Sequence, residues 1–170
     1  MPDADGRTAA ARWTPSHGDL RVAAGVLAYV VATVHLFHPK LGGRRLVRLL
    51  TVNPAVIATD PRPLAFVLSG LALVAGVLLV QRDNLHERPA LLAGIGLMVV
   101  YLVGYFGWHL SGHGGFLPNR EPLYHDFTPV EATVAHLGGD PFAATAVLSE
   151  LALLVVLLAL LRQGTADGED

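Results

Sequence analysis

Apolar residues along this chain gather into four long blocks that are separated by shorter polar stretches. The blocks cover residues 20–37, 64–80, 90–110 and 143–161, and the only charged positions inside them are Arg21 and Glu150. Each block is close to the roughly 20 residues that cross a hydrocarbon core as an α-helix. None shows the charged face of helical period that is typical of a soluble bundle. The pattern therefore predicts an all-α, polytopic membrane protein, a bundle of four transmembrane helices.

Two shorter helices are predicted in the connections between these spans. Over residues 43–50, arginines alternate with apolar residues at roughly helical spacing, which is typical of a helix lying in the headgroup layer. Later, Thr128 and Glu131 have the spacing of a capping box, with a proline at the first helical position. This signal predicts a second short interfacial helix over residues 129–136.

Composition supports the membrane prediction and excludes several functions. Apolar residues make up 52% of the chain and charged residues only 15%, whereas soluble domains carry roughly 25% charged residues. A net charge of −2 offers no basic field for nucleic acid, and the lack of cysteine excludes disulfides and thiolate chemistry. We expect a polar N-terminal tail (1–19), a transmembrane domain (20–161) and an acidic C-terminal tail (162–170). The expected partners are the lipid bilayer and either other membrane subunits or further copies of the same chain.

Four spans place both chain ends on one side of the membrane, here called face A, together with the loop 81–89. The loops 39–63 and 111–142 lie on the other side, face B. Each face receives six of the twelve Arg and Lys residues, so the positive-inside rule gives no orientation. Four-helix proteins with short tails usually keep both ends inside. We therefore expect a multi-pass protein of the cell membrane with cytoplasmic termini.

The histidines are distributed unevenly between the two faces. Six of the eight fall toward face B: His35, His38, His109, His113, His125 and His136. His35 and His38 are three residues apart and share a helix face. His109 and His113 share one only if the third span continues a turn beyond residue 110, through a glycine-rich stretch.

This clustering allows two explanations. In the first, His35, His38, His109 and His113 bind a metal ion or haem, because neutral imidazoles on neighbouring helices are the usual ligands of such groups. In the second, the rings are amphipathic residues at the membrane interface with no shared role. No HExxH motif, paired ExxH motif or cysteine cluster decides between them.

Polar residues inside the spans suggest a further possibility. Tyr101 and Tyr105 extend the His109 face of span three at four-residue steps, and Glu150 lies within span four. An acid at that depth is expected to face a cavity or a partner, so these residues are candidates for a proton or ion path. The structural alternative is a protonated Glu150 that holds the bundle together by a hydrogen bond.

Three segments carry a resemblance to a known group of proteins. They are Val34-His35-Leu36 at the end of span one, DPRPLAFVLSGL at 60–71 and YLVGY at 101–105. In these segments the chain resembles small, uncharacterised four-helix integral membrane proteins of haloarchaea, over residues 20–161. The resemblance implies this topology and an archaeal, halophilic source, which agrees with the acidic tails. That group has no established activity, so the resemblance transfers no catalytic residue.

Together these features predict a non-enzymatic membrane protein, such as a subunit or accessory of a larger membrane complex. A metal- or haem-binding protein that uses the face B histidines is the alternative. A small proton or ion transporter component that uses Glu150 is the second alternative. No phosphate-binding loop or GxSxG motif indicates an enzyme.

Overall fold

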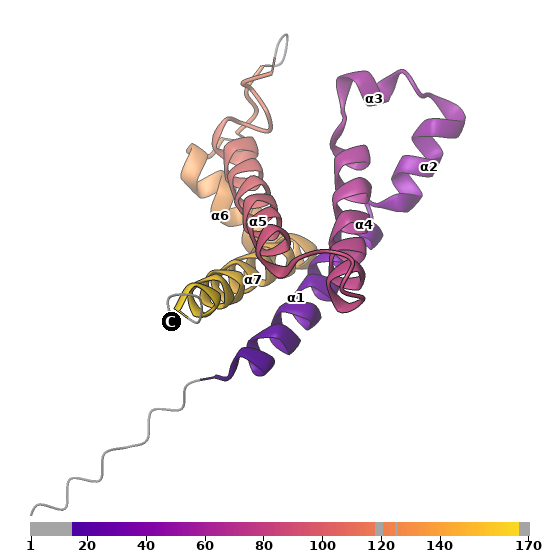
Figure 1. The fold of residues 1–170 in the computed structure, drawn as a ribbon. Helices are drawn as coiled ribbons and strands as arrows, with labels where there is room; N and C mark the ends of the chain where they lie inside the picture. The colour runs from indigo at the N-terminus through magenta and orange to yellow at the C-terminus, as the bar shows by residue number, and fades with distance from the viewer. Residues whose placement is uncertain (1–14, 118–120, 125, 167–170) are drawn as a thin grey trace, which may run out of the picture.

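The computed structural model describes residues 15–117, 121–124 and 126–166, and this part of the chain is helical without any strand (Figure 1). The helices are α1 (His17–Phe37), α2 (Gly43–Val52), α3 (Val56–Thr59), α4 (Arg62–Gln81), α5 (Glu87–Leu110), α6 (Pro129–Gly139) and α7 (Pro141–Ala166). Four of them, α1, α4, α5 and α7, are long and apolar enough to cross a membrane. The predicted all-α class and its four long apolar helices are confirmed.

Local capping explains where the long helices begin. Ser16 and Asp19 form a reciprocal capping box, in which the Ser16 Oγ accepts from the Asp19 N–H at 3.1 Å, so α1 starts before the predicted residue 20. The Asp140 carboxylate accepts from the Phe142 N–H at 2.9 Å and starts α7. Asp60 makes its shortest hydrogen bond, 2.7 Å, with the Arg62 guanidinium, and it accepts from the Arg62 backbone N–H at the start of α4 only at 3.4 Å.

The long helices alternate in direction, as four membrane spans require. In Figure 1, α1 and α7 cross near the centre, with α4 beside α1 and α5 beside α7. The Gln163 amide donates to the Pro15 carbonyl at 3.4 Å, and His17 lies 3.2 Å from Glu87. These contacts bring the end of α7 and the starts of α1 and α5 together on face A.

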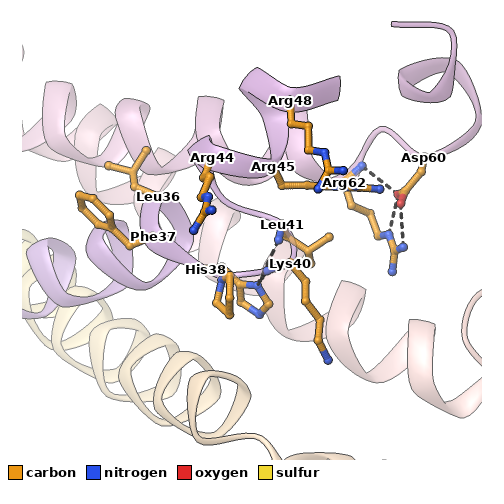
Figure 2. A pocket seen from close by; sticks show the side chains of 11 residues that line it. Leu36, Phe37, His38, Lys40, Leu41, Arg44, Arg45, Arg48, Asp60 and Arg62 are labelled. Carbon is orange, nitrogen blue, oxygen red and sulfur yellow. Dashed lines mark hydrogen bonds and ion pairs between the residues drawn. The ribbon is translucent and has the colours of Figure 1, made fainter. Parts of the chain in front are cut away.

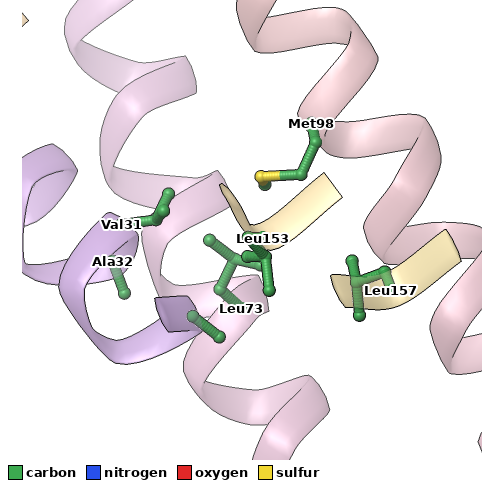
Figure 3. Packing of buried hydrophobic residues seen from close by; sticks show 7 residues of the cluster. Val31, Ala32, Leu73, Met98, Leu153 and Leu157 are labelled. Atoms are coloured by element: carbon green, nitrogen blue, oxygen red, sulfur yellow. The ribbon is translucent and has the colours of Figure 1, made fainter. Parts of the chain in front are cut away.

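The core lies where the four long helices meet. Its buried residues come from all of them: Ala28, Val31 and Ala32, Leu73, Met98, Leu153 and Leu157 (Figure 3). The outward faces are also apolar, since Val26, Leu68, Val103 and Val155 are between 57% and 66% exposed. Helices that are apolar on both faces fit a lipid environment better than water.

Both predicted short helices are present. α2 covers residues 43–50 and continues to Val52, with Leu46 and Leu49 buried. α6 begins at Pro129 behind the capping box of Thr128 and Glu131. It runs beyond the predicted residue 136 and ends where Asp140 starts α7.

Candidate functional site

Three histidines on face B form the most distinctive polar cluster in the described part of the chain. One ring nitrogen from each of His109, His113 and His136 can be chosen so that all three lie within 4.8 Å of one another. His109 comes from the last turn of α5, His113 from the turn that follows, and His136 from α6. Two helices and a turn therefore converge on one point.

His113 reaches the cluster through a left-handed turn, because α5 ends at Leu110 and does not continue as a helix. The φ angles of Gly112, His113 and Gly114 are +67°, +57° and +85°. This backbone is unusual for a residue with a side chain, and such conformations persist where the surroundings enforce them. At Gly114 a Cβ atom would overlap the Trp108 ring. The helix does not continue through this glycine-rich stretch, which the sequence left open, yet the rings of His109 and His113 still lie 5.4 Å apart between centroids.

α6 is placed by its N-terminal cap and by its buried face. The backbone N–H of Thr128 donates to the Glu131 carboxylate at 2.9 Å, and its hydroxyl donates at 2.8 Å. Both hydrogen bonds lower the pKa of Glu131, and the one from the backbone N–H has the larger effect. Ala132 and Thr133 are buried behind the cap, and His136 follows one turn after Ala132.

Backbone carbonyls set the protonation of all three rings. The Nδ1 atom of His109 lies 2.9 Å from the Tyr105 carbonyl oxygen, and that of His113 lies 2.9 Å from Leu123 O. The Nδ1 atom of His136 lies 2.7 Å from Ala132 O. Because a carbonyl only accepts, each Nδ1 carries the hydrogen and donates it. Each neutral ring then presents an Nε2 lone pair, as metal-bound histidines do.

Two of these lone pairs face each other at short range. The Nε2 atoms of His113 and His136 are 3.2 Å apart. Two lone pairs at this separation repel unless a cation lies between them, and that cation is a proton or a metal ion. Zn–N bonds of about 2.0–2.1 Å in a tetrahedral site place neighbouring nitrogens about 3.3 Å apart. The spacing of these two ligands therefore fits a bound metal ion, and a ring nitrogen of His109 lies within 4.8 Å of both residues.

A second polar feature, the pair of His35 and Glu150, lies inside the bundle. The two residues are only 2% and 3% exposed, and His35 Nε2 lies 3.5 Å from Glu150 Oε1. The His35 Nδ1 donates to the Val31 carbonyl at 2.9 Å, so Nε2 is the nitrogen that faces the acid. One proton between them makes the pair neutral overall, whichever group holds it. Sharing one proton offsets the desolvation cost of burying both groups.

Tyr101 and Tyr105 lie between this pair and the histidine cluster. The Tyr101 ring stacks on His35 at 4.1 Å between centroids, and Tyr105 lies 4.3 Å from His109. Both tyrosine hydroxyls are buried without a hydrogen-bond partner in the described structure. Ser69 donates its own proton to the Ala65 carbonyl at 2.5 Å, and its oxygen lies near the Tyr101 hydroxyl without forming a hydrogen bond of good geometry. Polar groups thus continue along α5 from the core toward face B.

The structure separates the four histidines that the sequence grouped as metal ligands. His109 and His113 join the cluster, whereas His35 pairs with Glu150 in the core. His38 accepts at Nδ1 from the backbone N–H groups of Lys40 and Leu41, at 3.1 and 3.2 Å, which leaves its hydrogen on Nε2. Burial lowers the pKa of His38, against the opposing effect of Asp140. His125 lies outside the described residues.

His136 was counted on face B but not among the predicted ligands. The capping box places it on a helix, but no local signal turns that helix toward α5. Arg62 was also missed as a structural neighbour of the cluster. Its guanidinium lies 3.8 Å above the ring of Trp108, the residue next to His109.

The resemblance to haloarchaeal four-helix proteins stays a prediction, because the comparisons neither support nor oppose it. No family model, curated protein or solved structure matches this chain.

Proposed function

We propose that this chain is a multi-pass membrane protein that binds one first-row transition-metal ion, such as Zn²⁺, at His109, His113 and His136. The observation that carries the proposal is the 3.2 Å separation of the His113 and His136 Nε2 atoms, whose rings both donate from Nδ1. Imidazole is a preferred ligand of Zn, Cu, Fe and Ni. Three protein ligands leave a coordination position for water or for a group from a partner.

The cluster favours a bare ion over haem. A haem iron takes its axial imidazoles from opposite sides of the porphyrin plane. The rings of His113 and His136 are 4.6 Å apart between centroids and touch through their Nε2 atoms. Rings in direct contact leave no room for a porphyrin between them.

The membrane location is part of the same proposal. Long apolar helices with exposed apolar faces support insertion, and the hydrogen bond between Gln163 and Pro15 supports both ends lying on face A. We place face A in the cytoplasm of the cell, with α2 and α6 in the headgroup layer of face B. Because the chain has no cysteine, Ser16→Cys and Thr51→Cys can be labelled singly with a membrane-impermeant maleimide. Labelling of only Thr51→Cys in intact cells supports this orientation, and labelling of only Ser16→Cys reverses it.

Metal binding is tested on the purified full chain after treatment with a chelator. Titration with Co²⁺ should give the absorption of a tetrahedral site at one ion per chain, and Zn²⁺ should displace it. His136→Ala should lower the affinity at least about tenfold, as loss of a ligand-shell residue does. His38→Ala, on the same face, is the matched control and should bind as the wild type does. No binding by the wild type, or equal binding by His136→Ala, would refute the proposal.

From the sequence, metal binding was the alternative to a non-enzymatic accessory function, and an accessory role for the metal site is a further part of this proposal. A metal ion held on a short loop helix offers a contact to a partner subunit of the same membrane. Co-purification of a partner that depends on His136 would support this accessory role.

The buried pair of His35 and Glu150 favours a second candidate function, that of a proton transporter component whose path runs from face B through the core. Its supporting observation is the continuation of the pair through Tyr101 and Tyr105 to His109. The test measures acidification of the interior of vesicles that contain the full chain, which an enclosed pH-sensitive dye reports. Glu150→Gln should abolish a flux that Glu87→Gln, on face A, retains. A wild-type flux equal to that of empty vesicles would exclude this function.

A further inference from the structure

A second charged site lies on face B, beside the end of α1. It is a cavity of about 810 Å³, and its lining includes no member of the histidine cluster. Five lining side chains are permanently positive and one is acidic: Lys40, Arg44, Arg45, Arg48 and Arg62, with Asp60. Figure 2 shows these side chains coming from α2, from the turn before it and from the start of α4.

The single acid does not balance this positive charge. Asp60 accepts from Nε and from a terminal nitrogen of Arg62, at 2.7 and 2.9 Å. The Arg62 guanidinium is also stacked on Trp108, so it is held at one side of the cavity. The other four cations form no ion pair with an acid in the described part of the chain. Like charges held this close favour a bound anion.

The first turn of α2 borders the same cavity, which Arg44 and Arg45 line. The N-cap residue, Gly42, makes no side-chain capping bond, so the N–H groups of Gly43 and Arg44 remain available to an anion. The N–H group of Arg45 instead donates to the Gly42 carbonyl at 3.0 Å. Gly42 is required there, because a Cβ atom would collide with the Leu36 carbonyl and the His38 backbone. Leu46 and Leu49 bury the opposite face of α2 and hold its arginines at the cavity.

We propose that this cavity binds a phosphate group. Arginine guanidinium groups and helix N-termini are the groups that recognise phosphate oxygens. An amphipathic helix with clustered arginines, next to the end of a membrane span, lies at the depth of lipid headgroups. The phosphate of an anionic phospholipid and free inorganic phosphate share this chemistry. The site does not depend on the proposed metal ion.

The experiment measures thermal unfolding of the full chain in neutral detergent. The additions are phosphatidylglycerol, phosphatidylcholine or inorganic phosphate, because a ligand that binds only the folded state raises the unfolding temperature. The test variant is Arg44→Gln with Arg48→Gln. The matched control is Arg82→Gln with Arg88→Gln on face A. Each basic residue near an anionic headgroup contributes about a factor of five, so the test variant should bind about 30-fold more weakly.

Two outcomes support the proposal and identify the source of the phosphate. Stabilisation by phosphatidylglycerol alone, lost in the test variant, indicates a lipid headgroup. Stabilisation by millimolar inorganic phosphate, lost in the same variant, indicates free phosphate. The proposal is overturned if the test and control variants show the same shift in unfolding temperature, or if neither phosphatidylglycerol nor inorganic phosphate stabilises the wild type. His136→Ala, which removes a proposed metal ligand, should leave the response unchanged, so failure of the metal site is distinguishable.

Discussion

His35 and Glu150 face each other at 3.5 Å in the interior of the helix bundle, where neither is more than 3% exposed. The pair joins α1 to α7, two helices that cross at the centre of the fold. Because both groups are polar and buried, each depends on the other to offset its desolvation.

Removing both members of this pair should cost less than the two single removals added together. Glu150→Leu leaves His35 Nε2 buried without its partner and should lower the free energy of unfolding by about 2–3 kcal/mol. The double variant with His35→Leu should lose less than the sum of the two single changes. Denaturation in mixed micelles measures all four proteins of the cycle. Strictly additive losses would show that the two side chains do not interact.

Gly114, in the turn after α5, should control metal affinity without being a ligand itself. Gly114→Ala places a Cβ atom against the Trp108 ring in a left-handed backbone, so the turn must shift and move His113. We expect the Co²⁺ affinity to fall at least about tenfold. Gly138→Ala, where a Cβ atom meets nothing within 4 Å, is the control and should leave affinity unchanged. Equal affinity in both variants would mean that the turn does not position His113.

Two pH windows should separate metal release from loss of the α6 cap. Protons compete with the metal ion for imidazole nitrogens, and imidazoles in general bind protons at a higher pH than carboxyls do, so metal affinity should fall first as the pH drops. The carboxyl of Glu131 has a lowered pKa, so its contribution to the cap is present above its ordinary value of 4.5. That contribution is lost only as the pH falls through the lowered pKa. Co²⁺ absorption should therefore disappear at a higher pH than the amide protection of α6. Simultaneous loss of both signals would contradict the assignment of the two groups.

Close packing of α1 against α4 depends on Gly70. A Cβ atom there would lie 3.0 Å from Leu36 Cγ and 3.3 Å from the Ala32 carbonyl, so Gly70→Ala should destabilise the bundle by about 1–3 kcal/mol. Gly76 lies later in the same helix, where a Cβ atom meets nothing within 4 Å. Gly76→Ala should be neutral or slightly stabilising, since alanine favours the helix. Unfolding midpoints in the same micelle compare the pair, and equal midpoints would exclude this packing role.

Much of the fold follows from local features of the sequence. A charge-free block of about 20 residues is visible without knowledge of its neighbours, and so is the capping box of Thr128 and Glu131. The ends of helices are harder to predict. α1 begins at the capping box of Ser16 and Asp19, which lies before its apolar block, and α7 continues as a helix into the predicted polar tail.

The candidate site follows from the sequence only in part. The gathering of histidines toward face B was predicted, and His109 and His113 do lie together. Their contact depends on a left-handed turn whose φ angles no periodicity reveals. The participation of His136 depends on how α6 packs against α5, a contact between residues far apart in the chain. His35 does not join the other predicted ligands, because it pairs with Glu150 in the core, where each buried polar group needs a partner.

A metal ion bound to His113 and His136 would close a loop between two residues that are 23 positions apart in the sequence. In a chain with no cysteine, this ion is the nearest equivalent of a disulfide, and the model for cross-links assigns such a loop about 3–4 kcal/mol of chain entropy. Unlike a disulfide, the metal ion can be removed by a chelator or by acid. The connection that leads into α7 would then stiffen when metal is abundant and loosen when metal is scarce. A protein that contacts face B would then meet a stiffer surface when the metal is abundant than when it is scarce.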